Sequence, residues 1–255
     1  MRDLLVNRRR LEYELHDPVV AGAPLVVFLH EGLGCLEAWR DFPARVAAAT
    51  GCGTLVYSRW GHGGSEARPG AWPVSFMHDE AQSSLPDLLG HLGIERPVLF
   101  GHSDGASIAL LHAAQYPDAV RAVISVAAHV MVEAETVESI RAARARFEEG
   151  SLRQGLERYH GPNTATMFDG WSGVWLHPAF RGWDIRPELG RVRCPVLAIQ
   201  GSADHYGTPV QLDAIRDGVA GPVVTSLLRG CGHSPHRDAP DAVIKAVSTL
   251  VARLE

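Results

Sequence analysis

A five-residue pattern in the middle of the chain, Gly-x-Ser-x-Gly at residues 101–105, constrains the fold more than any other feature. An apolar run at residues 97–100 precedes it, as in a buried parallel strand, and residues 106–114 follow with the composition of a packed helix. Glycines at both ends allow a tight strand-to-helix turn, which would expose the hydroxyl of Ser103 and direct the N–H of Asp104 at a reacting carbonyl oxygen. The pattern alone is short, so its weight comes from this strand-turn-helix context.

Segments typical of strands and of helices alternate along most of the chain. Apolar runs typical of buried strands lie at residues 25–29, 53–58, 97–100, 119–127, 194–200 and 222–228. Helical patterns separate or follow them, near residues 39–49, 75–92, 106–114, 208–218 and 240–254. Residues 4–16 alternate loosely, which is typical of an edge strand or hairpin. This order predicts an α/β fold with a mostly parallel central sheet and helices on both faces.

The composition changes over residues 133–188, where charged helical sequence is followed by a group of aromatic residues. We predict that this stretch is a small helical cap, inserted after the strand at 119–127 into a core domain formed by residues 1–132 and 189–255. Candidate walls of a substrate pocket are Trp171, Trp175 and Trp183 of the cap, together with Trp60 from an earlier loop. The alternative is that the cap aromatics only attach small helices to the core.

Charge and cysteine content exclude several classes of protein. With 24 basic and 29 acidic residues the net charge is −5 at pH 7, whereas a nucleic-acid-binding chain carries a basic surplus. The 4 cysteines form no Cys-x-x-Cys pair, so we expect free buried thiols in a reducing compartment. The histidines show no His-x-x-x-His spacing beside helical carboxylates, so we expect no metal site.

The N-terminal residues lack the apolar core of a signal peptide, and no run approaches the roughly 18 apolar residues of a membrane span. We therefore expect a cytoplasmic protein that acts on a small molecule and has no membrane or nucleic-acid partner. The sequence leaves the oligomeric state open.

A serine hydroxyl is a weak nucleophile unless a histidine takes its proton and a carboxylate orients that histidine. Both partners are expected in loops at the carboxyl ends of strands, because those loops converge on Ser103. His233 follows the last predicted strand, and Asp204 follows the strand before it. His236 is the rival for the base, and Glu133, at the end of another predicted strand, is the alternative acid.

Four motifs, in this order, resemble those of the α/β-hydrolase family over nearly the whole chain: His-Glu-Gly-Leu-Gly at 30–34, Gly-His-Ser-Asp-Gly at 101–105, Gly-Ser-Ala-Asp at 201–204 and Gly-His-Ser-Pro-His at 232–236. The loop at 59–65 is similar to a further family motif with one position shifted. The resemblance implies Ser103 as nucleophile, His233 as base and Asp204 as its orienting acid. It also implies an oxyanion hole made by the N–H of Asp104 and that of Gly32 or Leu33, and no cofactor.

Glu31 departs from the family pattern, because many relatives have glycine there. A carboxylate facing the pocket would disfavour anionic substrates, and Arg59 is a conceivable partner for it. The plainer interpretation is a carboxylate turned to solvent or bonded to nearby amides. We also expect the side chain of His102 to point away from the site, and the carboxylate of Asp104 to favour the N-terminus of the following helix.

The resulting hypothesis is a cofactor-independent serine hydrolase that cleaves an ester or related acyl bond of a small, mainly apolar substrate through an acyl-enzyme. The same triad could instead cleave a carbon–carbon bond, open a lactone or form peracids, since fold and triad do not fix the substrate. A non-catalytic small-molecule receptor of the same fold is a further alternative. The serine at 103 argues against the dehalogenase branch of the family, in which a carboxylate occupies that position.

Overall fold

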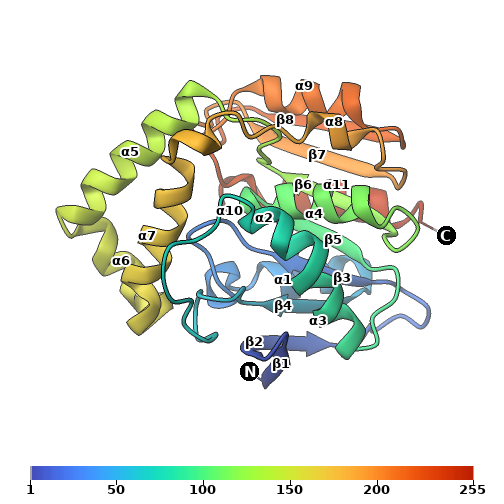
Figure 1. Cartoon of the computed structure of the whole chain (residues 1–255). Helices are drawn as coiled ribbons and strands as arrows, with labels where there is room; N and C mark the ends of the chain where they lie inside the picture. Colours follow the sequence, from blue (N-terminus) through green and yellow to red (C-terminus); the bar gives the residue numbers. More distant parts are fainter. Residues whose placement is uncertain (1, 255) are drawn as a thin grey trace.

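The structure, a computed structural model, describes residues 2–254, and its centre is an 8-stranded sheet with the order β1-β2-β4-β3-β5-β6-β7-β8 (Figure 1). The strands are β1 (Arg2–Val6), β2 (Arg9–His16), β3 (Leu25–Leu29), β4 (Gly53–Tyr57), β5 (Val98–His102), β6 (Ala122–Val126), β7 (Val196–Gly201) and β8 (Val223–Leu228). β1 and β2 form an antiparallel hairpin at one edge, and β2 pairs antiparallel with β4. All other pairs are parallel, so the predicted mostly parallel sheet is confirmed.

Helices cover both faces of the sheet, as predicted. They are α1 (Phe42–Thr50), α2 (Phe76–Asp79), α3 (Leu85–His91), α4 (Asp104–Gln115), α5 (Ala134–Glu148), α6 (Ser151–His160), α7 (Thr164–Trp175), α8 (Arg186–Leu189), α9 (Pro209–Gly218), α10 (Pro235–Asp238) and α11 (Pro240–Val251). Alternate residues of a strand serve opposite cores: Val27 of β3 packs in the core that includes α4, whereas Phe28 packs in the core that includes α1 and α11. The apolar runs that form β3 to β7 are therefore strands buried on both faces, whereas β8, at the edge of the sheet, is partly exposed.

The predicted helix at 75–92 is divided, because a π-helical turn, Glu80–Ser84, separates α2 from α3. Pro86 lies in the first turn of α3 and has no N–H to donate to the Gln82 carbonyl one turn earlier. The hydroxyl of Tyr116 donates to that carbonyl instead (3.0 Å), and a ring nitrogen of His112 donates to the neighbouring carbonyl of Ala81 (2.7 Å). Side chains from α4 and from the residue after it thus donate hydrogen bonds to the carbonyl groups that the widened turn leaves free.

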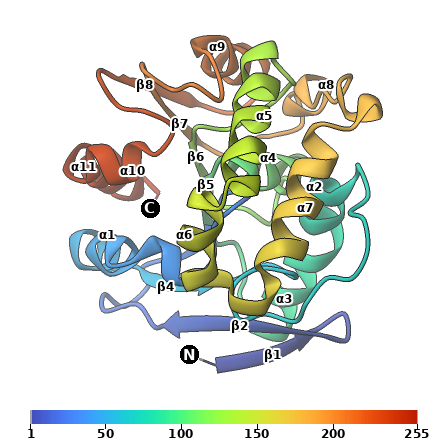
Figure 2. The same ribbon diagram turned by 90° about the vertical axis from the view of Figure 1, so that its left-hand side faces the viewer.

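Helices α5, α6 and α7 lie together beyond the carboxyl ends of the parallel strands, on the left in Figure 1 and facing the viewer in Figure 2. The chain leaves the sheet after β6 and returns to it at β7, so these helices occupy the interval in which the cap is predicted. The loops that follow β3, β5, β7 and β8 open toward them. Ligands of open parallel sheets bind at this edge. No helix within residues 2–254 is both long enough and apolar enough to cross a membrane.

Candidate active site

Ser103 stands at the turn between β5 and α4. Its backbone has φ +53° and ψ −120°, a combination that costs a non-glycine residue about 1–3 kcal/mol. The Ser103 N–H donates to the carbonyl of Val126 (2.9 Å), and the Ser103 carbonyl accepts from the N–H groups of Ala106 (2.9 Å) and Ser107 (3.1 Å). These hydrogen bonds hold the sharp turn and leave the hydroxyl beyond the end of the strand.

Glycine is required on both sides of Ser103, because the backbone segments approach too closely for a side chain. A Cβ at Gly101 would overlap the carbonyl of Gly105 and the backbone of Ala106, and a Cβ at Gly105 would overlap the carbonyl of Leu29 at the end of β3. The obstructing atoms belong to the backbone and cannot rotate away. The Gly-x-Ser-x-Gly pattern is therefore a packing requirement of the turn.

The structure brings His233 and Asp204 to Ser103. His233 Nε2 lies 2.9 Å from the Ser103 hydroxyl oxygen, and His233 Nδ1 lies 2.9 Å from each carboxylate oxygen of Asp204. Because a carboxylate only accepts, Nδ1 carries the proton and Nε2 is free to accept from the serine. The carboxylate itself is held by the N–H of Tyr206 (2.8 Å) and the amide of Gln200 (3.0 Å).

Burial and hydrogen bonding set the charges of this pair in the way a general base requires. Burial lowers the pKa of His233, although the Asp204 carboxylate acts in the opposite direction, so the imidazole is neutral at neutral pH. Burial alone would raise the pKa of Asp204. The hydrogen bond from His233, its charge and the N–H of Tyr206 outweigh burial, and the pKa lies below its usual value.

The turn after β3 and the first residue of α4 place free N–H groups in the same cavity as Ser103. Gly32, Leu33 and Asp104 line this cavity, and their N–H groups donate no hydrogen bond to any residue between 2 and 254. The turn is fixed from its other side, where the Gly34 N–H donates to the Glu31 carbonyl (3.1 Å). These are the backbone groups expected to form the oxyanion hole.

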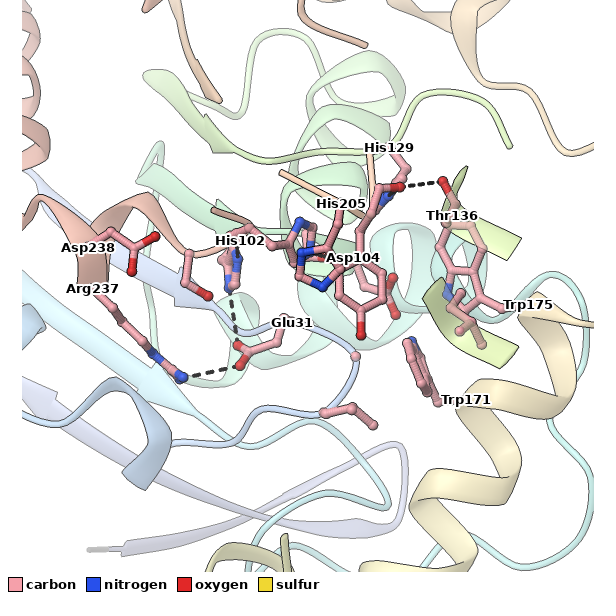
Figure 3. Close-up of a pocket in the computed structure, with 17 residues that line it drawn as sticks. Glu31, His102, Asp104, His129, Thr136, Trp171, Trp175, His205, Arg237 and Asp238 are labelled. Carbon is pink, nitrogen blue, oxygen red and sulfur yellow. Dashed lines mark hydrogen bonds and ion pairs between the residues drawn. The ribbon is translucent and has the colours of Figure 1, made fainter. Parts of the chain in front are cut away.

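The Glu31 carboxylate lies in the cavity and is paired (Figure 3). One oxygen is 3.3 Å from His102 Nδ1 and the other is 3.4 Å from the Arg237 guanidinium. Burial would raise the pKa of Glu31, but the hydrogen bond with His102 and the charges of His102 and Arg237 hold it well below its usual value. Arg59, the partner that the sequence made conceivable, donates to the backbone carbonyls of His30 (3.2 Å) and Glu31 (2.9 Å) and not to the Glu31 carboxylate.

His102 also differs from expectation, because its side chain lines the cavity and does not point away from the site. Its Nε2 lies 2.7 Å from the backbone carbonyl of His233 and must donate to it, since a carbonyl only accepts. His102 thus links the Glu31 carboxylate to the loop that carries His233. The residue directly before the candidate nucleophile therefore helps to hold the loop of the candidate base in place.

The cavity has a volume of about 360 Å³, and two of the predicted aromatic residues form part of its wall. Trp171 and Trp175 come from α7, and Thr136 and Ile140 of α5 complete that side. Trp171 lies directly against Gly32, where a Cβ would overlap its indole ring. Figure 3 shows both tryptophans on the side of the cavity opposite Arg237 and Asp238.

Trp60 and Trp183 do not line this cavity. The ring of Trp60 lies under the guanidinium of Arg9, 3.6 Å from its centroid, at the β1–β2 hairpin. Trp183 stacks on Phe180 at 5.3 Å between ring centroids and attaches the segment after α7 to the core. For these two residues the structure favours a packing role.

The rival residues lie elsewhere or have other partners. His236 lies in α10, buried between Trp39 and His102, with neither ring nitrogen hydrogen-bonded. Glu133 accepts hydrogen bonds from the N–H and hydroxyl of Thr208 (3.0 and 2.5 Å) and from the amide of Gln211 (2.6 Å). Neither residue contacts the Ser103 hydroxyl or His233 in hydrogen-bonding geometry.

Several cavity residues escaped the sequence analysis. His129 follows β6 and Tyr206 follows Asp204, so the rule that loops at the carboxyl ends of strands converge would have found both. Arg237 carried no signal, because its role depends on a pairing with Glu31 from a distant loop. Within residues 2–254 no group of three or more His, Cys, Asp or Glu side chains is placed to hold a metal ion.

Comparison with solved structures supports the same fold. The chain superimposes on an enol-lactonase from Burkholderia xenovorans with a TM-score of 0.76 at 22% identity, covering 99% of this chain and 100% of that one. An esterase from Thermogutta terrifontis gives a TM-score of 0.74 at 18% identity, with 99% and 98% covered. At these identities the likeness concerns the fold alone.

Sequence relatives extend the comparison. The chain is 26% identical to epoxide hydrolase A of Mycobacterium tuberculosis, over 92% of each protein. It is 33% identical to an sn-1-specific diacylglycerol lipase of Mus musculus over 46% of this chain and 36% of that protein. The model of the alpha/beta hydrolase family matches residues 26–246, which include the elbow serine, the acid and the histidine described above. The chain therefore belongs to the alpha/beta hydrolase family and is a hydrolase of that family.

Proposed function

We propose that the chain is a serine hydrolase that cleaves an ester or related acyl bond of a small, mainly apolar substrate. The observation that carries the proposal is the connected series from the Ser103 hydroxyl to His233 Nε2 and from His233 Nδ1 to the Asp204 carboxylate, with 2.9 Å at each step. The neutral state of His233, favoured by burial, leaves Nε2 able to accept the serine proton.

The reaction begins when Ser103 attacks the carbonyl carbon of the substrate and passes its proton to His233. The negative charge that develops on the carbonyl oxygen is stabilised by the N–H of Asp104 and an N–H of the 32–33 turn, and each such donor contributes about 3–4 kcal/mol. His233 then gives its proton to the leaving oxygen, and the acyl-enzyme remains. A water molecule that transfers a proton to His233 attacks the acyl-enzyme, which releases the acid and restores Ser103.

The nucleophile also favours acyl transfer over epoxide opening, the reaction named for one relative. A serine oxygen that opened an epoxide would form an ether, and an ether offers water no carbonyl carbon to attack. A serine oxygen that attacks an ester forms a new ester, which the same machinery hydrolyses. Trp171 and Trp175 supply the apolar wall for such a substrate.

Labelling with a fluorophosphonate tests the proposal, because this reagent needs a serine activated by a base. The wild-type protein should be labelled and should hydrolyse short p-nitrophenyl esters, and Ser103→Ala should lose both properties. Ser107→Ala is the matched control and should retain labelling, since the Ser107 hydroxyl bonds the backbone carbonyl of His129 (2.6 Å). A wild-type protein that is not labelled would refute the proposal and favour a receptor.

A further inference from the structure

Asp104 has a second polar group that the proposed reaction does not use. Its side chain lines the cavity, yet the residue is only 1% exposed, and its Oδ2 atom is buried without a hydrogen-bond partner among residues 2–254. Asp104 lies in the first turn of α4, where the sequence placed it to favour the helix N-terminus, but its side chain makes no capping hydrogen bond. Figure 3 shows Asp104 near the centre of the cavity, between His102 and the tryptophans. A buried carboxylate without a donor is costly, and native structures rarely keep one without a use.

The surroundings of Asp104 explain why it lacks a partner. The nearby Arg59 guanidinium donates to the backbone carbonyls of His30 and Glu31 and forms no ion pair with Asp104. The indole N–H of Trp175 faces the carboxyl and favours its charged form, but it makes no hydrogen bond. Burial raises the pKa of Asp104 to about 6, so its surroundings disfavour the charged carboxylate.

His129 adds a second acceptor to the same region. Its Nε2 donates to the backbone carbonyl of Tyr206 (3.1 Å), so Nδ1 carries the lone pair, and this atom is buried without a partner. Burial and the charge of His233 lower the pKa of His129 to about 4, which keeps the ring neutral. The ring lies 5.0 Å from that of Trp175, whose N–H faces Asp104. The cavity thus holds two acceptors that lack donors.

The other acidic groups of the cavity already have partners. Glu31 pairs with His102 and Arg237, and Asp238 accepts the N–H of Gly232 (2.7 Å). Arg237, the one arginine or lysine that lines the cavity among residues 2–254, is directed at Glu31 (Figure 3). A ligand that supplies several N–H donors and a positive charge would complete the site at Asp104.

Resting on the proposed function, we propose that the acyl part of the substrate carries a protonated amine close to its carbonyl group, bound by the Asp104 carboxylate with His129 Nδ1 as second acceptor. An ammonium group has three donors and a full charge, which matches two acceptors of which one is anionic. The N–H and the carboxylate of Asp104 belong to one residue, so a group bound by the carboxylate lies near the carbon that Ser103 attacks. The substrate class is therefore amino-acyl esters or closely related acyl compounds.

The test compares methyl esters that differ in one group. Phenylalanine methyl ester carries the amine, methyl 3-phenylpropanoate has hydrogen at that position, and methyl 3-phenyllactate is the neutral polar control. An ammonium group makes an ester intrinsically more reactive, so the decisive quantity is the change in the ratio of kcat/KM values between wild type and Asp104→Asn. Assays at pH 6.5 keep the amine largely protonated. We expect the amine-to-hydrogen ratio to fall at least about 30-fold in Asp104→Asn, the effect of removing one partner of a buried charge pair.

Asp238→Asn is the matched control, because it removes a charge from the same cavity at a carboxylate that already has a donor. It should leave the ratio within about threefold of wild type. An equal fall in both variants would assign the effect to the overall charge of the cavity and would overturn the role of Asp104. An unchanged ratio in Asp104→Asn would overturn the inference, as would a preference for 2-(dimethylamino)ethyl 3-phenylpropanoate, which carries its amine on the alcohol side.

Two further measurements keep the outcomes distinct. Fluorophosphonate labelling of the wild type reports the proposed function without any amine, so labelling together with an unchanged ratio removes only the inference. If Asp104→Asn does not fold, Ser103→Ala retains the carboxylate and serves for binding. Phenylalaninamide should bind this variant at least about 30-fold more tightly than 3-phenylpropanamide, and equal affinities would contradict the proposal.

Discussion

Replacing Asp204 by asparagine changes one atom and tests the assignment of the acid. His233 Nδ1 is 2.9 Å from both carboxylate oxygens, so in either orientation the carboxamide replaces one of the two acceptors that face Nδ1 by an NH₂ donor. One oxygen also accepts the N–H of Tyr206 and the other accepts the amide of Gln200, which donates in addition to the Gly207 carbonyl (2.9 Å). The NH₂ group of the new carboxamide must therefore face a donor in either orientation.

The consequence for His233 is a change of tautomer. An NH₂ group facing Nδ1 stabilises the form with a bare Nδ1 and a protonated Nε2, and a protonated Nε2 cannot accept from Ser103. The imidazolium formed during attack also loses its counter-charge. We expect kcat to fall by about 10⁴, which corresponds to about 5.5 kcal/mol of activation free energy.

Steady-state kinetics on a p-nitrophenyl ester measures this loss, and circular dichroism checks that the variant is folded. Glu133→Gln is the control, because Glu133 is the alternative acid and its carboxylate accepts from Thr208 and Gln211. It should cost about 1–3 kcal/mol of stability and leave kcat within tenfold. The reasoning would be refuted if Asp204→Asn kept near-wild-type turnover while Glu133→Gln lost it.

Three further predictions concern the surroundings of the triad. Glu31→Gln should leave the fold intact and lower kcat about tenfold. His102 loses its anionic partner in this variant, and His102 is the residue that holds the backbone carbonyl of His233. Unchanged kinetics on several esters would contradict this. Ser103→Gly should be about 1 kcal/mol more stable than Ser103→Ala in urea unfolding, since only glycine adopts φ +53° and ψ −120° without strain, and the reverse order would show that the elbow is unstrained. The third prediction is that stability falls as the pH drops below about 6.5. In this range the unfolded chain binds more protons than the folded chain. Each histidine with a lowered pKa therefore reduces the free energy of unfolding by up to about 1.4 kcal/mol per pH unit, whereas a group with a raised pKa, such as Asp104, acts in the opposite direction. Equal stability at pH 7.5 and 5.5 would refute this prediction. Burial is the largest cause of the lowered pKa for His30, His62, His112, His129, His160, His233 and His236.

The fold and the three central side chains were accessible from the sequence, because both depend on local patterns. Buried parallel strands are continuous apolar runs, and the order of strands and helices predicted the sheet. Ser103, Asp204 and His233 each follow a strand, and all three loops open at the same edge of the sheet. The catalytic roles of these residues, and the division into core and cap, stay predictions.

The features that the sequence did not reveal depend on contacts between distant segments. Glu31 follows β3, His102 ends β5 and Arg237 lies in α10, and no periodicity relates the three positions. The interrupted helix at 76–91 depends on a hydroxyl from Tyr116 that replaces the missing proline N–H. Trp60 illustrates the opposite error. Its aromatic character suggested a pocket wall, whereas the guanidinium groups of Arg9, from the hairpin, and Arg68, from the loop after β4, lie over its ring.

The contact between Trp171 and Gly32 has a consequence for how this chain can vary. Any side chain at position 32 would overlap the indole of Trp171, so a larger residue is accommodated at 32 only after position 171 has become smaller. The two positions lie on elements far apart in the sequence, yet substitutions at them should be strongly non-additive. Residues other than glycine are thus expected at position 32 only in variants or relatives that have a small residue at position 171. In those sequences, the backbone of the oxyanion turn and the apolar wall of the cavity change together.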